Sequence, residues 1–265
     1  MSLKLTILGC GSSGGVPRIG NHWGSCNPAN PKNNRKRCSL MVEQSHSNGT
    51  TRVLIDTSPD LRDQLLAAGV GVLDGVVFTH PHADHTHGID ELRAVALNMR
   101  RRVPVWADSR TSDALFSRFA YAFRTPEGSV YPPILDIALL RPPAPVEIAG
   151  EGGKLTLVPF EVDHGDIRAL GFRVGNVAYT PDINGVPAES QIALSGLSCW
   201  IVDALRRTPH PSHWSLPETL EWISRYKPKT AVITNMHLDL DYDALCKELP
   251  PHVTPAYDGM LLSFD

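Results

Sequence analysis

The chain has 265 residues, of which 42% are hydrophobic and 20% charged, and its net charge is −3 with neutral histidines. This balance is typical of a globular protein with a sizeable core, and it excludes a global basic footprint for nucleic acid. No apolar run reaches the roughly 20 residues of a membrane span, and the N-terminus lacks a secretory signal pattern.

The five cysteines are odd in number and widely spread along the chain. Such spacing does not indicate a disulfide framework. We therefore expect a cytoplasmic protein with free thiols that does not bind membranes.

Residues 4–8 predict a first strand, which is followed by Gly9-Cys10-Gly11-Ser12-Ser13-Gly14. These letters match the dinucleotide-binding fingerprint, but that fingerprint requires a helix opening at its third glycine. A Gly/Asn/Pro-rich stretch follows instead, so we reject a nucleotide-binding fold. The glycines fit a tight turn near an active site, where their amides could contact an anion.

Residues 18–38 predict a long, irregular, basic loop that contains His22, Cys26 and Cys38. These three side chains are conceivable ligands of a structural zinc ion. Because the loop has no CxxC pair, we favour a solvated loop with two free thiols.

Residues 39–43 and 52–57 alternate like two antiparallel strands, and residues 60–68 predict a helix that ends at Gly69. Asp56 stands at the end of the second strand. A carboxylate in this place suits a partner that orients a metal-bound histidine.

Four residues of metal-ligand type follow a short buried strand at 73–78: His80, His82, Asp84 and His85. In an extended segment His80 and His82 point the same way, so they can hold one ion together. The chain then enters a helix over 89–97, which directs Asp84 and His85 to a neighbouring position. This spacing predicts two metals about 3.5–4 Å apart.

Residues 103–107 predict a strand and 109–123 a helix, before a Pro- and Gly-rich surface excursion over 124–153 with a short strand near 134–139. Three later strands, at 155–162, 177–180 and 230–234, each end near a further candidate ligand. These candidates are His164, Asp182 and His237. Together with the first cluster they complete two coordination spheres.

A strand at 198–204 leads to a loop with His210 and His213, and Ser215 with Glu218 forms a capping-box pattern before a helix that ends at 226. The two histidines are placed to meet an anion or a leaving group, although idle surface histidines are the alternative. A helix at 241–249 and a strand at 259–264 end the chain. This order predicts an α/β fold with two mixed sheets and outer helices.

The run from His80 to His85, with Gly88, resembles the HxHxDHxxG signature of the metallo-β-lactamase superfamily. Asp56 before this run, and His164, Asp182 and His237 after it, appear in the order of that family. The resemblance implies an αββα sandwich in one domain over residues 1–265, with insertions near 18–38 and 124–153. It also implies ligand roles: one metal on His80, His82 and His164, the other on Asp84, His85 and His237, with Asp182 bridging both.

Within the superfamily, the glycine-rich opening resembles the cyclic phosphodiesterases of the carbon–phosphorus lyase pathway. That family carries a structural zinc in the cysteine-containing insertion. Only Cys26 matches here, because Asn21 and Trp23 stand where cysteines are expected. Asn235 stands at the usual histidine after the last ligand strand, and His237 comes two residues later.

We therefore expect two divalent ions, zinc or manganese, and a bridging hydroxide that attacks small phosphodiesters, cyclic ones above all. Asp84 would orient this nucleophile, and His213 or His210 would protonate the leaving alkoxide. The expected partner is a cyclic nucleotide-like small molecule rather than nucleic acid, and the chain is compatible with a homodimer.

Three other functions stay open. A nuclease for tRNA 3′ ends would need a basic arm, against which the overall acidity argues. A thioester or lactone hydrolase would use the same metals. A catalytically inactive scaffold would have lost ligands, whereas all seven candidates are present.

Overall fold

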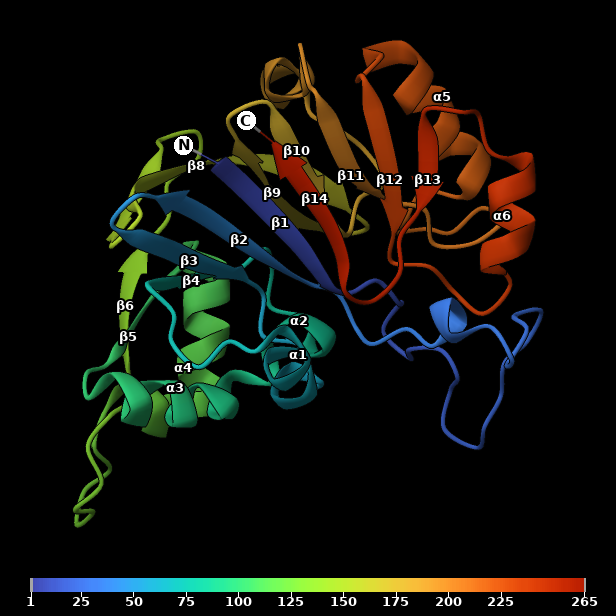
Figure 1. Cartoon of the computed structure of the whole chain (residues 1–265). Helices are drawn as coiled ribbons and strands as arrows, with labels where there is room; N and C mark the ends of the chain where they lie inside the picture. The colour runs from blue at the N-terminus through green and yellow to red at the C-terminus, as the bar shows by residue number, and fades with distance from the viewer. Residues whose placement is uncertain (1, 265) are drawn as a thin grey trace. The chain divides into compact units, whose positions relative to one another are not determined.

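The computed structural model describes residues 2–264, which form two compact units (Figure 1). The first unit contains residues 2–8, 39–156 and 261–264, and the second contains residues 9–38 and 157–260. Each unit is described in turn. The single domain expected over residues 1–265 stays a prediction.

The first sheet has seven strands in the order β14-β1-β2-β3-β4-β5-β6. In this order the strands are Met260–Phe264, Ser2–Gly9, Ser39–His46, Gly49–Ile55, Gly75–Val77, Val103–Ala107 and Leu135–Leu139. The red β14 and the blue β1 lie beside one another (Figure 1). Strands β2 and β3 are antiparallel, whereas β3, β4, β5 and β6 are parallel neighbours. Because parallel strands end at one sheet edge, the segments after β3 and β4 lie together there.

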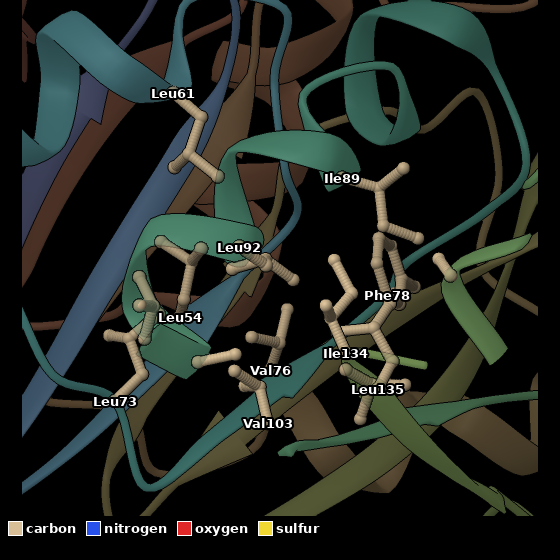
Figure 2. Packing of buried hydrophobic residues seen from close by; sticks show 14 of the residues in the cluster. Leu54, Leu61, Leu73, Val76, Phe78, Ile89, Leu92, Val103, Ile134 and Leu135 are labelled. Carbon is tan, nitrogen blue, oxygen red and sulfur yellow. The ribbon is translucent and has the colours of Figure 1, made fainter. Parts of the chain in front are cut away.

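Three helices pack their apolar sides on this sheet: α1 (Leu61–Ala68), α3 (Leu92–Met99) and α4 (Ser109–Phe123). Figure 2 shows Leu61, Leu92 and Ile89 converging on side chains of the strands, among them Leu54 and Val76. These side chains are almost fully buried, and each contributes about 1.5–3 kcal/mol when it leaves water. The cluster fixes the helices that border the loop after β4.

The second sheet has the order β13-β12-β11-β10-β9-β8-β7. In this order the strands are Val253–Pro255, Thr230–Thr234, Cys199–Asp203, Val177–Thr180, Ile167–Val174, Gly153–His164 and Val146–Gly150. Strands β10 to β13 are parallel, and β9 is antiparallel to both β8 and β10. Strands β8, β10, β11 and β12 therefore all end at the same edge.

Helix α5 (Leu216–Tyr226) begins with the predicted capping box, in which the Ser215 amide donates to Glu218 at 2.8 Å. Its aromatic side chains stack in the second unit: Trp222 lies on Trp214 with ring centroids 4.9 Å apart. The remaining short helices are η1 (Pro31–Asn33), α2 (Ala83–Thr86), η2 (Ile89–Glu91), η3 (Ala188–Leu194) and α6 (Tyr242–Glu248). No helix in the described part of the chain is both long and apolar enough to cross a bilayer.

The predicted α/β class with two mixed sheets and outer helices is confirmed. The absence of a helix after the glycine-rich turn at residues 9–15 is also confirmed. Three strands were not predicted, β7, β9 and β13, of which β7 lies in the expected excursion over 124–153.

Candidate metal centre

The predicted ligands of the first unit lie on the loop between β4 and α3. His80 is fully buried, His82 is exposed at the start of α2, and His85 is buried inside that short helix. Asp84 is half-buried, and its Oδ2 lies 3.5 Å from His85 Nε2. The structure therefore brings all four side chains of the first motif into one cluster.

His80 and His82 present ring nitrogens to each other, with 3.1 Å between His80 Nε2 and His82 Nδ1. The hydroxyl of Thr79 donates to Asp56, so its oxygen accepts from His80 Nδ1 at 2.9 Å. This contact fixes the tautomer of His80 and leaves the lone pair on Nε2.

Asp56 is the buried carboxylate behind this loop. Its Oδ1 accepts from the Thr79 amide at 2.8 Å, and its Oδ2 accepts from His85 Nδ1 at 2.7 Å. Burial raises the pKa of Asp56, and the contacts with His85 and Thr79 oppose that rise. The expected support of a histidine by Asp56 is confirmed, and the contact orients His85 Nε2 away from the carboxylate.

The backbone around the motif is tightly packed. Gly88 donates its amide to Thr57 O at 2.9 Å, and a Cβ on Gly88 would lie 1.9 Å from Ser58 O. The signature glycine is therefore a steric requirement of this loop. The guanidinium of Arg118 on α4 donates to Pro81 O and braces the segment between His80 and His82.

The second unit places His164 at the end of β8 and Asp182 just after β10, and both are buried. His164 Nε2 lies 3.6 Å from Asp182 Oδ2. His164 Nδ1 donates to Ser212 O at 2.7 Å, because a carbonyl oxygen only accepts. The lone pair of His164 is therefore on the nitrogen that faces Asp182.

His213 forms a dyad with Asp203, which is fully buried at the end of β11. His213 Nδ1 lies 2.7 Å from Asp203 Oδ2, and Asn235 Nδ2 donates to Asp203 Oδ1 at 3.2 Å. Burial raises the pKa of Asp203 to about 7, whereas His213 acts to lower it. His213 Nε2 points toward Asp182, with 4.0 Å to its Oδ2.

His210 is half-buried next to this dyad, with its ring centroid 5.2 Å from that of His213. The Ser212 amide donates to His210 Nδ1 at 3.3 Å. Burial lowers the pKa of His210, and His213 and Arg206 lower it further. The structure thus brings both predicted loop histidines together in the second unit.

The contacts of His237 differ from the predicted ligand role. Arg18 Nη2 lies 2.6 Å from His237 Nε2, and His237 Nδ1 lies 3.2 Å from Asp239 Oδ1. A guanidinium only donates, so His237 Nε2 accepts from Arg18 and Nδ1 carries the proton toward Asp239. Both ring nitrogens are thereby engaged by protein groups, and the ligand role of His237 stays a prediction.

The donors of each unit fit divalent metal binding. His80, His85 and His164 each have one ring nitrogen tied to a protein oxygen and the other directed toward a side chain of metal-ligand type in the same unit, the usual arrangement of a ligating imidazole. The 3.1 Å between His80 Nε2 and His82 Nδ1 is close to the roughly 3.3 Å between two nitrogens bound at about 2.0–2.1 Å to one tetrahedral ion. Mixed imidazole and carboxylate donors suit zinc or manganese.

The thiols of the 18–38 loop have separate partners. Cys26 Sγ accepts from Arg35 at 3.8 Å, whereas Cys38 Sγ donates to Gly11 O at 3.6 Å. This agrees with the favoured interpretation of two free thiols. Sequence reasoning missed Asp203 and Arg18. The position of Asp203 at the end of a strand, like that of Asp182, was the available signal.

A family model described as a β-lactamase superfamily domain matches residues 51–236. A crystal structure described as a new diphosphatase from the PhnP family is 33% identical, with a TM-score of 0.88, over 100% of this chain and 98% of its own. An octanoyltransferase of Porphyromonas gingivalis is 32% identical over 97% of this chain, and a ribonuclease Z of Bradyrhizobium sp. is 30% identical over 54%.

The alignments cover 51% and 45% of these two proteins, so the chain spans about half the length of the curated relatives it matches. The family match, in contrast, includes the first histidine motif, His164, Asp182 and His213. The chain therefore belongs to the β-lactamase superfamily and has the metallo-β-lactamase fold.

Proposed function

We propose that the chain is a metal-dependent hydrolase of small phosphodiesters, with cyclic phosphates as the first substrates to test. The observation that carries this proposal is the orientation of the imidazoles. In His80, His85 and His164 one ring nitrogen is held by a protein oxygen, and the other carries the lone pair and faces a further side chain of metal-ligand type, namely His82, Asp84 and Asp182 respectively. This is the protonation pattern that metal binding requires.

The residues that would hold two divalent ions come from both units: His80, His82, Asp84, His85, His164 and Asp182. We assign the ligands of the first unit and those of the second unit to one metal centre because their motifs occur in the order of the family. Such ions would lower the pKa of water and neutralise charge on phosphoryl oxygens. His237 is left out because Arg18 and Asp239 engage its ring nitrogens.

His213 is the residue that we assign to protonation of the leaving alkoxide. Asp203 holds His213 Nδ1 at 2.7 Å, so the ring is fixed with Nε2 on the side of Asp182. An imidazole donates a proton effectively near neutral pH, and a carboxylate partner stabilises its charged form. The ring centroid of His210 lies 5.2 Å from that of His213, so His210 is the second candidate for this proton transfer.

The class of substrate follows from the phosphoryl chemistry of the solved relative. That protein is described as a diphosphatase and covers this chain completely. We therefore place a diphosphate diester beside bis(p-nitrophenyl) phosphate and 2′,3′-cyclic nucleotides in the first assay. These three substrates share a singly anionic phosphorus with two substituted oxygens, and they differ in ring strain and leaving group.

The first test combines metal analysis of the purified protein with turnover of these substrates in added manganese or zinc. We expect about two metals per chain and hydrolysis of at least one small diester. Asp182→Ala should lower activity by about 10²–10³-fold, because it removes a carboxylate from the proposed centre. His46→Ala is the matched control, since His46 is an exposed histidine at the end of β2.

The other functions correspond to other outcomes of the same assay. Cleavage of a tRNA precursor alone would favour a nuclease, and turnover of an octanoyl thioester alone would favour an acyl hydrolase. Two metals without any hydrolysis, together with partner binding, would favour a scaffold. A protein that binds no divalent metal would refute the proposal.

A further inference from the structure

A groove in the first unit lies at the edge of the sheet away from the first histidine motif. Residues 100–102, directly before β5, and residues 131–134, directly before β6, line this groove. Strands β4, β5 and β6 are parallel, and the motif that begins with His80 follows the end of β4. Because parallel strands start at one edge of a sheet and end at the other, the groove is separate from the candidate ligands of this unit.

One face of α3 forms a wall of the groove. Arg93, Ala96, Leu97 and Arg100 all line it, and their spacing of three, four and seven positions is that of a single helix face. Leu97 is 71% exposed although it is a large apolar side chain. This face of α3 therefore presents an apolar middle with an arginine at either end.

The stretch before β6 supplies another apolar wall, with the sequence Tyr-Pro-Pro-Ile at 131–134. The Val103 amide donates to Ile134 O at 2.9 Å, and the Ile134 amide donates to Ala122 O at 2.9 Å. These bonds fix the wall to β5 and α4, so the groove is part of the fold. Its volume of about 510 Å³ lies within the roughly 300–1,000 Å³ of small-molecule sites.

The charged side chains at the groove are all cationic. Among the described residues that line it, four are arginines and none is acidic. Three of these arginines pair with acids outside the lining: Arg93 with Asp90, Arg101 with Asp74 and Arg102 with Asp136. In the part of the chain that the structure describes, Arg100 has no carboxylate within ion-pair distance. Its exposed guanidinium therefore keeps its donors for an anion from solution.

We propose that this groove binds a small organic anion with an apolar body, of which a medium-chain carboxylate is the simplest member. The apolar chain lies along Leu97 and Ile134, and the carboxylate accepts hydrogen bonds from Arg100. A guanidinium presents two parallel N–H groups that match the two carboxylate oxygens. A second copy of the chain is a poorer occupant, because a symmetric pair would bring the arginines of both copies together.

The test is titration calorimetry of the purified full chain with three probes: decanoate, butyrate and decyltrimethylammonium. We expect one decanoate per chain. Butyrate has the charge without the long chain, and decyltrimethylammonium has the chain with the opposite charge, so both should bind at least about tenfold more weakly. This measurement needs neither metal nor turnover, and its outcome is independent of the proposed function.

Arg100→Gly should weaken decanoate binding about tenfold, the usual effect of a lost hydrogen bond to a charged group. Arg100 has φ 53° and ψ 30°, a conformation that favours glycine, so this variant keeps the backbone. Lys227→Gly is the matched control, because Lys227 ends α5 in the same conformation, with φ 47°, in the second unit. Leu97→Gln should weaken decanoate binding about 3- to 10-fold through lost apolar contact.

Two kinds of result would overturn the inference. The first is equal binding of decanoate and decyltrimethylammonium, or a decanoate affinity that Arg100→Gly changes no more than Lys227→Gly does. The second is binding to phosphatidylglycerol vesicles without binding of decanoate, which would assign this surface to a membrane.

Discussion

Single residues of the second unit determine whether a leaving group would receive a proton. Asp203 is fully buried, and it holds His213 Nδ1 at 2.7 Å. A residue that protonates the leaving group matters only where that group is a poor one, such as a sugar alkoxide. p-Nitrophenolate leaves without a proton, so the two leaving groups separate this role from every other role of His213.

We predict that His213→Gln lowers kcat on a 2′,3′-cyclic nucleotide by about 10²–10⁴-fold, the usual contribution of general acid catalysis. The loss on bis(p-nitrophenyl) phosphate should be at least ten times smaller. Steady-state kinetics on both substrates, with His46→Gln as control, measure this difference. Equal losses on both substrates would assign His213 to binding rather than to proton transfer.

Among single residues, the sequence predicts those whose partners are close in the chain. His80, His82 and His85 share one loop, and their spacing alone predicts a cluster. The contact between Arg18 and His237 spans 219 residues, so no local pattern indicates it. The ligand role of His237 stays a prediction, which rests on its position after a strand, and the structure adds a contact with a distant arginine that this position does not indicate.

The loop at residues 18–38 is an element held by one buried side chain. Arg35 is 1% exposed and donates to Leu240 O at 2.6 Å and to Asn33 Oδ1 at 3.2 Å. Asn33 in turn donates to Asp241 at 2.7 Å. This network ties the loop to the segment after His237 by hydrogen bonds to a guanidinium.

We predict that Arg35→Met lowers the free energy of unfolding by about 2–4 kcal/mol, because it leaves buried acceptors without a donor. Urea unfolding followed by circular dichroism measures the change, with Arg225→Met as the exposed control. Zinc analysis of the native protein tests the alternative, which is that a structural zinc ion holds this loop. A loss no larger than that of the control would show that Arg35 does not hold the loop.

Most elements could be predicted because their patterns are local. The helix at Ser109–Phe123 and the strands at Val177–Thr180 and Thr230–Thr234 have the predicted bounds. Strand β9 was missed because Gly171 and two arginines interrupt its pattern. The reason for Gly171 is a long-range contact, since a Cβ there would lie 2.5 Å from the Phe160 ring. Strand β13 is short and ends in proline, which suits an edge strand.

Over the whole molecule, a net charge of −3 describes the average and not the distribution of charge. Arg18 and Arg206 both lie near His237 in the second unit, although the chain is slightly acidic overall. The acidity argued against nucleic acid as a partner, and a small anion is compatible with both observations. Charge totals predict the class of partner less well than charges that lie side by side.

The stability of the whole molecule should also depend on Asp258. This carboxylate accepts from the Lys36 amide at 2.7 Å and from the Cys10 amide at 3.2 Å, which ties the C-terminal segment to the glycine-rich turn. Burial raises its pKa from the ordinary 3.8 to about 6, although these hydrogen bonds oppose the rise. The folded state therefore binds a proton more tightly than the unfolded state.

The sign of the effect follows from that difference. The contribution of Asp258 to stability is fully present below about pH 4 and is lost as the pH rises through about 6. At about 1.4 kcal/mol per pH unit, the loss is about 3 kcal/mol. In Asp258→Asn this dependence disappears. The unfolding free energy of the native protein minus that of the variant should therefore fall between pH 4 and pH 7. Urea unfolding at pH 4, 5, 6 and 7 measures it, and a difference that stays constant would show that Asp258 does not titrate with folding.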